Sequence, residues 1–359
     1  MRTSIRIGLA VILTTFAAEL VMRAFVTMPS NQVYDPEIGY RYLPNSVILE
    51  GLEGHARNRT NSLGLNSEEV NPAKAKRALL LGDSYTEARQ VPRARNFASL
   101  TAAALPGWDI VNAGRDGLNV VNTLPIARRI SKVARVDRIV LVMSNSDYVD
   151  ELLQAGVKER IDADGQAQVA MDVEAREDLK QAFESLVHHS ALAVQLIRQF
   201  KPIILDAQQA LLRFRHQAKL LAPAHAAGSA SASSPMATDD DATRARRLGI
   251  LIQQLQKIAP VDMVFVHQLE YKSSRIAVPG PTPMKAERAV RGIVEPLGVS
   301  MVNTAPYLID RYRTTGEPPF GFPNSQMGSG HLNAAGHQAI AAALCDLLNE
   351  TTTDRRVRP

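Results

Sequence analysis

Five short apolar runs constrain the fold of this 359-residue chain more than any other feature of its sequence. They lie at Ala78–Leu81, Asp109–Val111, Arg138–Met143, Val261–Val266 and Ser300–Val302. Segments whose apolar residues have helical spacing separate these runs, at residues 96–104, 121–133, 243–258 and 282–297. Buried strands that alternate with helices form parallel sheets covered by helices on both faces. The sequence therefore predicts an α/β fold, a flavodoxin-like three-layer α/β/α domain whose central parallel sheet has about five strands.

Changes in composition divide the chain around that domain. Residues 76–350 form the predicted domain, and two segments interrupt its alternation of strands and helices. Residues 149–221 are expected to be a mainly helical insertion, and residues 222–241, rich in Ala, Ser, Gly and Pro, a disordered loop. Residues 27–75 are a loop-rich lead-in with two short strands, and residues 351–359 are a polar tail expected to fray.

Residues 1–26 have the pattern of a membrane anchor or a signal segment. Arg2 and Arg6 precede an uncharged apolar run at Ile7–Ala18, and Glu19 follows it at the position expected for the outer membrane interface. A positively charged leader stays in the cytoplasm, so everything after the segment is expected outside it. We predict a single-pass protein of the inner (cytoplasmic) membrane with a periplasmic domain. Secretion after cleavage of the segment is the alternative.

Charge and cysteine content exclude several classes of function. The net charge of +5 is spread along the chain, without the clustered Lys and Arg and the stacking aromatics of a nucleic-acid surface, so no nucleic-acid partner is expected. Cys345 is the only cysteine, which excludes an internal disulfide and a cysteine-based zinc site. The pair His188–His189 lacks partners at metal-ligand spacing. No metal or cofactor is predicted.

Two polar residues follow the predicted elements at positions suited to catalysis. Ser84 comes directly after the first apolar run, in Gly82-Asp83-Ser84, where a sharp turn would expose its hydroxyl and aim helix N–H groups at an oxyanion. A tripeptide of this kind is by itself more typical of an ordinary helix cap. His331 precedes a helix that Asn333 would cap, at the same edge of the sheet as Ser84.

Four ordered blocks resemble those of the SGNH (GDSL-type) hydrolases. The blocks are Leu81–Glu87, Val111–Gly114, Val142–Asp147 and His331–His337, and Asn61–Gly64 resembles a lead-in found in anchored members. The resemblance implies that Ser84 is the nucleophile and His331 the general base. It also implies that the N–H groups of Ser84 and Gly114 are oxyanion donors.

The chain departs from the family pattern at two positions. Where the third block normally supplies an asparagine before its aspartate, this chain has Ser146, with Asn145 one residue earlier, so either residue is a candidate oxyanion donor. The aspartate that normally lies three residues before the histidine is replaced by Gly328. We therefore expect a Ser–His dyad whose His331 Nδ1 faces a backbone carbonyl, most simply that of Gly328. A triad completed by an acid from elsewhere is the alternative.

Together these features predict a serine esterase that acts on acyl esters, O-acetyl esters above all, of extracytoplasmic glycans. The expected partners are an acylated carbohydrate or a small ester, and the membrane through residues 1–26. An O-acyltransferase on the same fold is one alternative, because the acyl acceptor leaves no mark in the sequence. A non-catalytic glycan-binding or scaffold module of an envelope or exopolysaccharide assembly is the other, favoured by Gly328 and Ser146.

Overall fold

The computed structural model describes residues 2–154, 156–162, 165–171, 189–197, 236–269, 271–272, 275–276 and 281–354. The chain forms two compact units. One comprises residues 1–30 and 176–239, and the other comprises residues 31–175 and 240–359.

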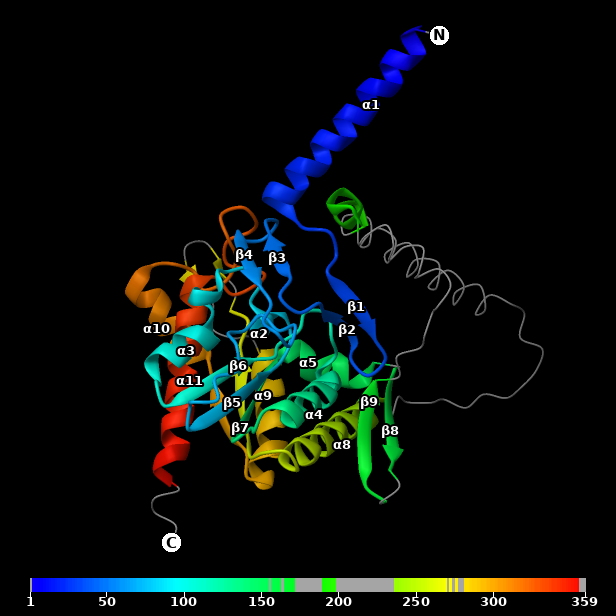
Figure 1. The fold of residues 1–359 in the computed structure, drawn as a ribbon. Coiled ribbons are helices and arrows are strands. Elements are labelled where there is room, and N and C mark those ends of the chain that lie inside the picture. The colour runs from blue at the N-terminus through cyan, green and yellow to red at the C-terminus, as the bar shows by residue number, and fades with distance from the viewer. Residues whose placement is uncertain are drawn as a thin grey trace, which may run out of the picture. The chain divides into compact units, whose positions relative to one another are not determined.

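The larger unit is built on a five-stranded parallel sheet, drawn in Figure 1. Its strands are β5 (Lys76–Leu81), β6 (Trp108–Asn112), β7 (Arg138–Ser144), β10 (Val261–Val266) and β13 (Ser300–Asn303). Their order across the sheet is β13-β10-β7-β5-β6, and every neighbouring pair is parallel. Numbered along the chain, this order is the flavodoxin-like one, 2-1-3-4-5. The predicted fold class is confirmed, and all five predicted strands are present.

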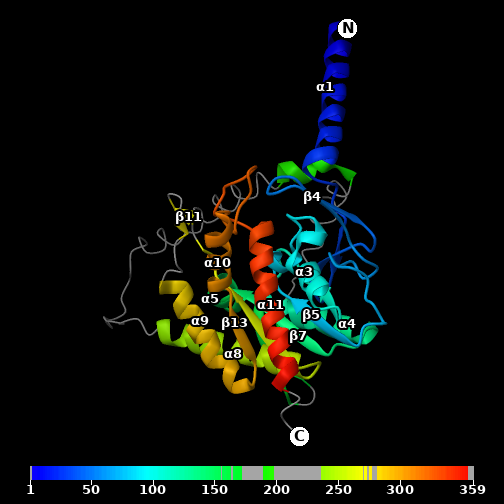
Figure 2. The same ribbon diagram turned by 90° about the vertical axis from the view of Figure 1, so that its left-hand side faces the viewer.

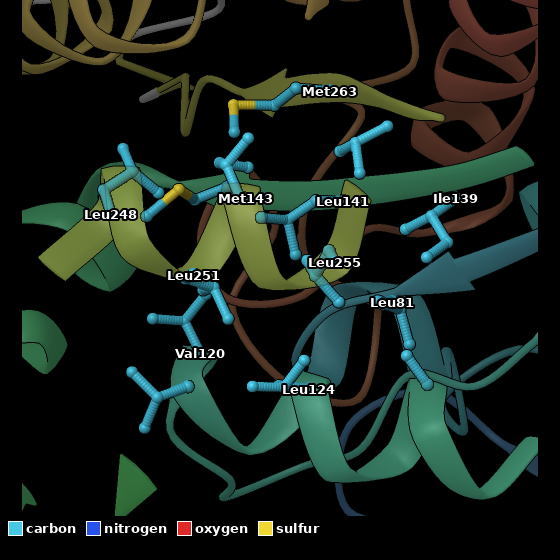
Figure 3. Packing of buried hydrophobic residues seen from close by; sticks show 14 of the residues in the cluster. Leu81, Val120, Leu124, Ile139, Leu141, Met143, Leu248, Leu251, Leu255 and Met263 are labelled. Carbon is cyan, nitrogen blue, oxygen red and sulfur yellow. The ribbon is translucent and has the colours of Figure 1, made fainter. Parts of the chain in front are cut away.

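Helices cover both faces of this sheet, as Figure 2 shows. The α-helices of the unit are α2 (Ser84–Glu87), α3 (Phe97–Ala104), α4 (Thr123–Val133), α5 (Asn145–Val149), α8 (Met236–Gln256, whose first residues lie in the other unit), α9 (Pro281–Val294), α10 (Ala305–Thr315) and α11 (Ala334–Asp354). Helices α4, α8 and α9 share one hydrophobic core with the sheet, and α3, α10 and α11 share the other. Figure 3 shows the first core, where Leu81, Ile139 and Leu141 of the strands meet α4 and α8.

Short elements complete the unit. They are the 3-10 turns Arg93–Arg95, Val120–Asn122, Glu151–Leu153 and Glu295–Leu297 and the two-residue strands β11 (Tyr271–Lys272) and β12 (Arg275–Ile276).

The lead-in is more ordered than its composition predicts. It contains two antiparallel hairpins instead of two short strands: β1 (Gln32–Asp35) with β2 (Gly39–Tyr42), and β3 (Val47–Glu50) with β4 (Ala56–Arg59). Its strands have four residues each and little apolar alternation, so ion pairs with the rest of the unit replace part of the missing apolar burial. Glu50 of β3 is buried against Arg89, and Asp35 of β1 against Arg129.

Three predicted segments need correction. Within the predicted helical insertion, β8 (Val157–Ile161) and β9 (Ala167–Met171) form an antiparallel hairpin that buries Val157 and Val169, while Lys158, Glu159 and Arg160 are exposed. Helix α8 begins at Met236, inside the segment predicted to be disordered, and its acidic residues suit a helix N-terminus. Helix α11 runs to Asp354, beyond the predicted start of the tail. Residues 172–188, 198–235 and 355–359 lie outside the described part of the chain.

The smaller unit contains the apolar N-terminal helix. Helix α1 (Arg2–Val21) continues as one π-helical stretch over Met22–Val26. Together Thr3–Val26 form a 24-residue helical segment whose most apolar 18-residue window has a mean hydropathy of 1.9 and no buried part. A segment of this length and composition is compatible with a single-pass membrane anchor or with a signal sequence. A short helix at residues 191–197 is also described in this unit.

Candidate active site

Ser84 stands on a tight turn between β5 and α2, at the carboxyl edge of the sheet. A side chain at Gly82 would lie 2.3 Å from Thr86 Oγ1 and 2.7 Å from the Val142 carbonyl, so the turn requires glycine there. Asp83 caps the helix by accepting a hydrogen bond from the Tyr85 N–H at 2.9 Å. Ser84 is thus the first helical residue, half-buried, with its hydroxyl at the end of a central strand.

His331 is held in place by the N-terminus of α11. The Asn333 side chain accepts hydrogen bonds from the Ala335 and Gly336 N–H groups and donates to the carbonyls of Pro318 and Gly321. This fixes the loop just before the helix, and the imidazole then reaches the serine: His331 Nε2 lies 3.0 Å from Ser84 Oγ. The distance is that of a nucleophile and its general base.

The third member of the arrangement is Glu53, which the sequence did not identify. Glu53 Oε2 lies 2.6 Å from His331 Nδ1, and its Oε1 accepts a hydrogen bond from the His331 N–H at 2.7 Å. The expectation that His331 Nδ1 faces the Gly328 carbonyl is therefore wrong. A carboxylate from the turn of the β3–β4 hairpin occupies that place, which is the alternative of a triad completed from elsewhere.

Two glycines in the loop before His331 allow Glu53 to approach the histidine. A side chain at Gly330, whose φ is +89°, would lie 2.2 Å from Glu53 Oε1, so only glycine lets the carboxylate approach the histidine backbone. Gly328 serves the same loop differently: its N–H donates to the Phe320 carbonyl at 2.8 Å, with φ at +82°.

Glu53 is suited to orient the histidine. Burial raises the pKa of its carboxyl, but the hydrogen bonds from the His331 ring and backbone and the positive charges of His331 and Arg89 outweigh burial and hold that pKa below its ordinary value. The group is therefore a carboxylate near neutral pH, and a carboxylate only accepts hydrogen bonds. It selects the tautomer with the proton on Nδ1, which leaves Nε2 free to take the proton of Ser84.

A single asparagine ties the Glu53 turn to the loop that carries His331. The Asn324 side chain donates to the carbonyls of Gly51 and Gly54 at 3.0 and 2.7 Å, and it accepts from the Gly54 N–H at 2.9 Å. These bonds bracket Glu53 on both sides. Tyr85, next to the serine, has its ring edge-on to His331 with 5.8 Å between centroids.

The predicted oxyanion donors differ in the hydrogen bonds that they already make. The Gly114 N–H, a predicted oxyanion donor, donates to Asn112 Oδ1 at 3.0 Å, so it would have to give up this hydrogen bond to bind an oxyanion. Asn145 and Ser146 begin α5, directly after the strand next to β5. Asn145 Oδ1 is buried without a partner among the described residues, whereas the exposed Ser146 Oγ lies 2.9 Å from Ser144 Oγ. The Ser84 N–H opens α2.

With this geometry established, comparison with known proteins gives neighbours in structure but not in sequence. No family model matches the chain, and no curated protein matches it in sequence. Solved structures similar to it include a lipolytic G-D-S-L protein and esterases. A member of the lipolytic protein G-D-S-L family from Veillonella parvula is 11% identical, with 77% of this chain and 99% of that chain covered and a TM-score of 0.38. An acetylxylan esterase from Geobacillus stearothermophilus is 13% identical, with coverages of 76% and 93% and a TM-score of 0.37.

Three further carboxyls gather beside the serine turn. Asp83, Asp147 and Glu151 line a cavity of about 10 Å³, enough for one water molecule. Burial raises the pKa of Asp147 to about 6, and burial together with the charge of Asp147 raises the pKa of Glu151 to about 7. Burial and Asp147 also raise the pKa of Asp83 well above its ordinary value. Within the described ranges, no group of three or more His, Cys, Asp or Glu residues is arranged to hold a metal ion.

Proposed function

We propose that this protein is a serine ester hydrolase with Ser84, His331 and Glu53 as its catalytic residues. The observation that carries the proposal is the continuous chain of contacts from Ser84 Oγ to His331 Nε2 at 3.0 Å and from His331 Nδ1 to Glu53 at 2.6 Å. The acid also bears on the alternatives, because a carboxylate in this place supports an active site over a non-catalytic binding module.

The reaction follows from the three contacts. Ser84 Oγ attacks the ester carbonyl while its proton passes to His331 Nε2, and the Glu53 carboxylate stabilises the imidazolium that forms. The tetrahedral intermediate collapses when His331 returns that proton to the leaving alcohol, and an acyl-serine remains. Water then takes the acyl group through the same histidine. The Ser84 N–H at the start of α2 and a group from Asn145 or Ser146 would bind the oxyanion.

We propose acyl esters of extracytoplasmic glycans, O-acetyl esters above all, as the substrates. The apolar segment Thr3–Val26 with its basic leader supports this, because it would hold the catalytic unit on the outer face of the cytoplasmic membrane. A protein released there by cleavage would meet the same substrates. If a sugar hydroxyl instead of water accepts the acyl group, the same residues perform O-acyl transfer.

A fluorophosphonate probe tests the catalytic proposal. It reacts only with serines activated by a neighbouring base, so we expect covalent labelling at Ser84 in the full-length protein, with none in Ser84→Ala and a greatly slowed reaction in His331→Ala. Ser131→Ala, which removes a serine hydroxyl in the last turn of α4 that donates to the Arg128 carbonyl, should still be labelled. Absence of labelling in the folded wild-type protein would refute an activated serine and favour the binding module.

A further inference from the structure

Glu19 is the one charged residue between Ile7 and Met22, and it lies near the carboxyl end of α1. Both oxygens of its carboxylate accept hydrogen bonds. It accepts hydrogen bonds from Arg23 Nε at 2.6 Å, from Ser190 Oγ at 2.9 Å, and from the N–H groups of Ala191 and Leu192 at 2.8 and 2.9 Å. The anchor helix thus holds a second segment, far away in sequence, by the first turn of a short helix.

The contact also involves the π-helical stretch Met22–Val26 that continues α1. Arg23 Nη2 donates a hydrogen bond to the His189 carbonyl at 2.6 Å. Arg23 and Glu19 therefore hydrogen-bond to the backbone on both sides of Ser190. The side chain of Glu19 is only 17% exposed. The first N–H groups of a helix have no partner within that helix, and without water they need an acceptor from elsewhere. Glu19 supplies that acceptor.

The depth of Glu19 decides where this contact lies. A helix rises about 1.5 Å per residue, which places Glu19 roughly 24 Å from Thr3 along the axis. The hydrocarbon core of a bilayer is about 30 Å thick, so Glu19 would sit near its outer edge when α1 spans the membrane. A charged group at that depth is costly unless it is paired, and here Arg23 and the helix N-terminus pair it.

Residues 190–197 are uncharged and largely apolar, which suits the outer edge of the hydrocarbon core, where Glu19 would lie. Leu196 is 44% exposed, and Leu192, Val194 and Ile197 are half-buried, while no residue from Ala191 to Ile197 carries a charge. We infer that residues 190–197 form a second membrane contact, embedded in the outer lipid interface and fixed there by the Glu19 carboxylate. The inference rests on the proposal that α1 remains in the membrane, and its partner is the lipid bilayer itself.

Spin labels measure the depth directly. Single-cysteine variants Leu196→Cys and Leu13→Cys are made in a Cys345→Ser background of the full-length protein, placed in phosphatidylcholine–phosphatidylglycerol vesicles and labelled with a nitroxide. Collisions with oxygen, which concentrates in lipid, are compared with collisions with a water-soluble nickel chelate. We expect both labels to favour oxygen. Adding Glu19→Ala should shift the ratio at position 196 several-fold toward the nickel chelate and leave position 13 unchanged.

Each other outcome has a separate meaning. A label at position 196 that favours nickel while the label at 13 favours oxygen overturns the second contact and leaves the anchor intact. Both labels favouring nickel would contradict the anchor and the inference together. An oxygen-favouring label at 196 that Glu19→Ala does not move overturns the role of the carboxylate. Glu19→Gln, which keeps an acceptor oxygen, should shift position 196 less than Glu19→Ala does. Ester turnover is independent of all these readings.

Discussion

At the scale of single residues, the proposed chemistry depends on Glu53, a carboxylate from another part of the chain that lies against His331 Nδ1, where a backbone carbonyl was expected. We expect Glu53→Gln to lower kcat for a small acetyl ester by roughly 10²- to 10⁴-fold, because the amide can hold the ring in the wrong tautomer and cannot stabilise the imidazolium. KM should change little, since Glu53 contacts the histidine. Glu68→Gln, an exposed glutamate of the same lead-in, is the matched control and should keep full activity. Equal kcat in both variants would remove Glu53 from the triad.

Gly330 offers a sharper test because a glycine elsewhere has the same backbone conformation without the same neighbour. Gly330 and Gly316 both have positive φ, at +89° and +71°. An added methyl group would lie 2.2 Å from Glu53 Oε1 at position 330 and meet nothing within 4 Å at position 316. Both substitutions to Ala should destabilise the fold by about 1 kcal/mol through backbone strain. Only Gly330→Ala should also lower kcat, by about 10-fold or more.

A comparison of the two variants at equal fractions of folded protein, by urea unfolding and ester turnover, separates strain from the displacement of Glu53. If Gly316→Ala lost as much turnover per folded molecule, the close approach at Gly330 would have no catalytic meaning.

The sequence predicted that Ser84 and His331 would lie together because each stands at a fixed place next to a predicted element, and the structure places them 3.0 Å apart. Ser84 follows a buried strand, and His331 precedes a capped helix, so the topology brings both to one sheet edge. Glu53 precedes Ser84 by 31 residues in a segment without periodicity, and only the packing of a hairpin against the His331 loop brings it to the site. The Asn112 side chain likewise reaches Gly114 through local geometry that no pattern encodes.

At the scale of elements, the β3–β4 hairpin brings Glu53 to the proposed active site by packing against the loop that carries His331. Asn324 makes three hydrogen bonds to the turn that carries Glu53. We expect Asn324→Ala to lower kcat by about 10-fold or more without a matching change in KM, because the carboxylate loses its position while the substrate contacts remain. The loss should be smaller in the Glu53→Gln background, because both changes act through the same histidine.

Ser325→Ala, at the next residue, is the control, since within the described part of the chain its hydroxyl makes one long hydrogen bond, to the Phe322 carbonyl at 3.4 Å. If the losses from Asn324→Ala and Glu53→Gln simply add in the double variant, Asn324 acts elsewhere and does not position Glu53.

The amount of apolar surface that an element buries explains whether the sequence predicted it. The central strands are continuous apolar runs because both faces are covered, and such runs are visible without alignment. The hairpins β1–β2, β3–β4 and β8–β9 bury few apolar side chains, so their strands have no strong pattern. Helix α8 starts early because the pairing of Asp241 with Arg244 supports a turn that composition alone assigns to a loop.

At the scale of the whole molecule, the buried carboxyls beside the serine turn make the stability of the fold depend on pH. Burial raises the pKa values of Asp147 to about 6 and of Glu151 to about 7, whereas unfolded carboxyls ionise near pH ~4. At pH values between the unfolded pKa and the raised folded pKa, the folded protein binds more protons than the unfolded chain. The free energy of unfolding therefore falls as pH rises through this range, and these groups favour the fold most below the unfolded pKa.

Replacing Glu151 by Gln removes one of these titrations. We expect the decrease in the free energy of unfolding between about pH 5 and about pH 8 to shrink by roughly 1–2 kcal/mol, a value discounted because Glu151 is only half-buried. The amide can still accept the hydrogen bond that the Val120 N–H now gives to Glu151 Oε2 at 2.6 Å, so packing should survive. Urea unfolding of the full chain in micelles at both pH values measures the change.

Glu159→Gln is the control, because folding lowers the pKa of Glu159 whereas it raises the pKa of Glu151. Hydrogen bonds from Arg246 and Arg247 hold the pKa of Glu159 below its ordinary value, so its contribution is present above the unfolded pKa and is lost only in more acidic solution. That variant should keep the wild-type decrease between the two pH values. If Glu151→Gln kept this decrease as well, Glu151 would ionise at its ordinary pKa in the folded protein, and the three carboxyls would be separate solvated groups instead of one buried cluster beside the turn that carries Ser84.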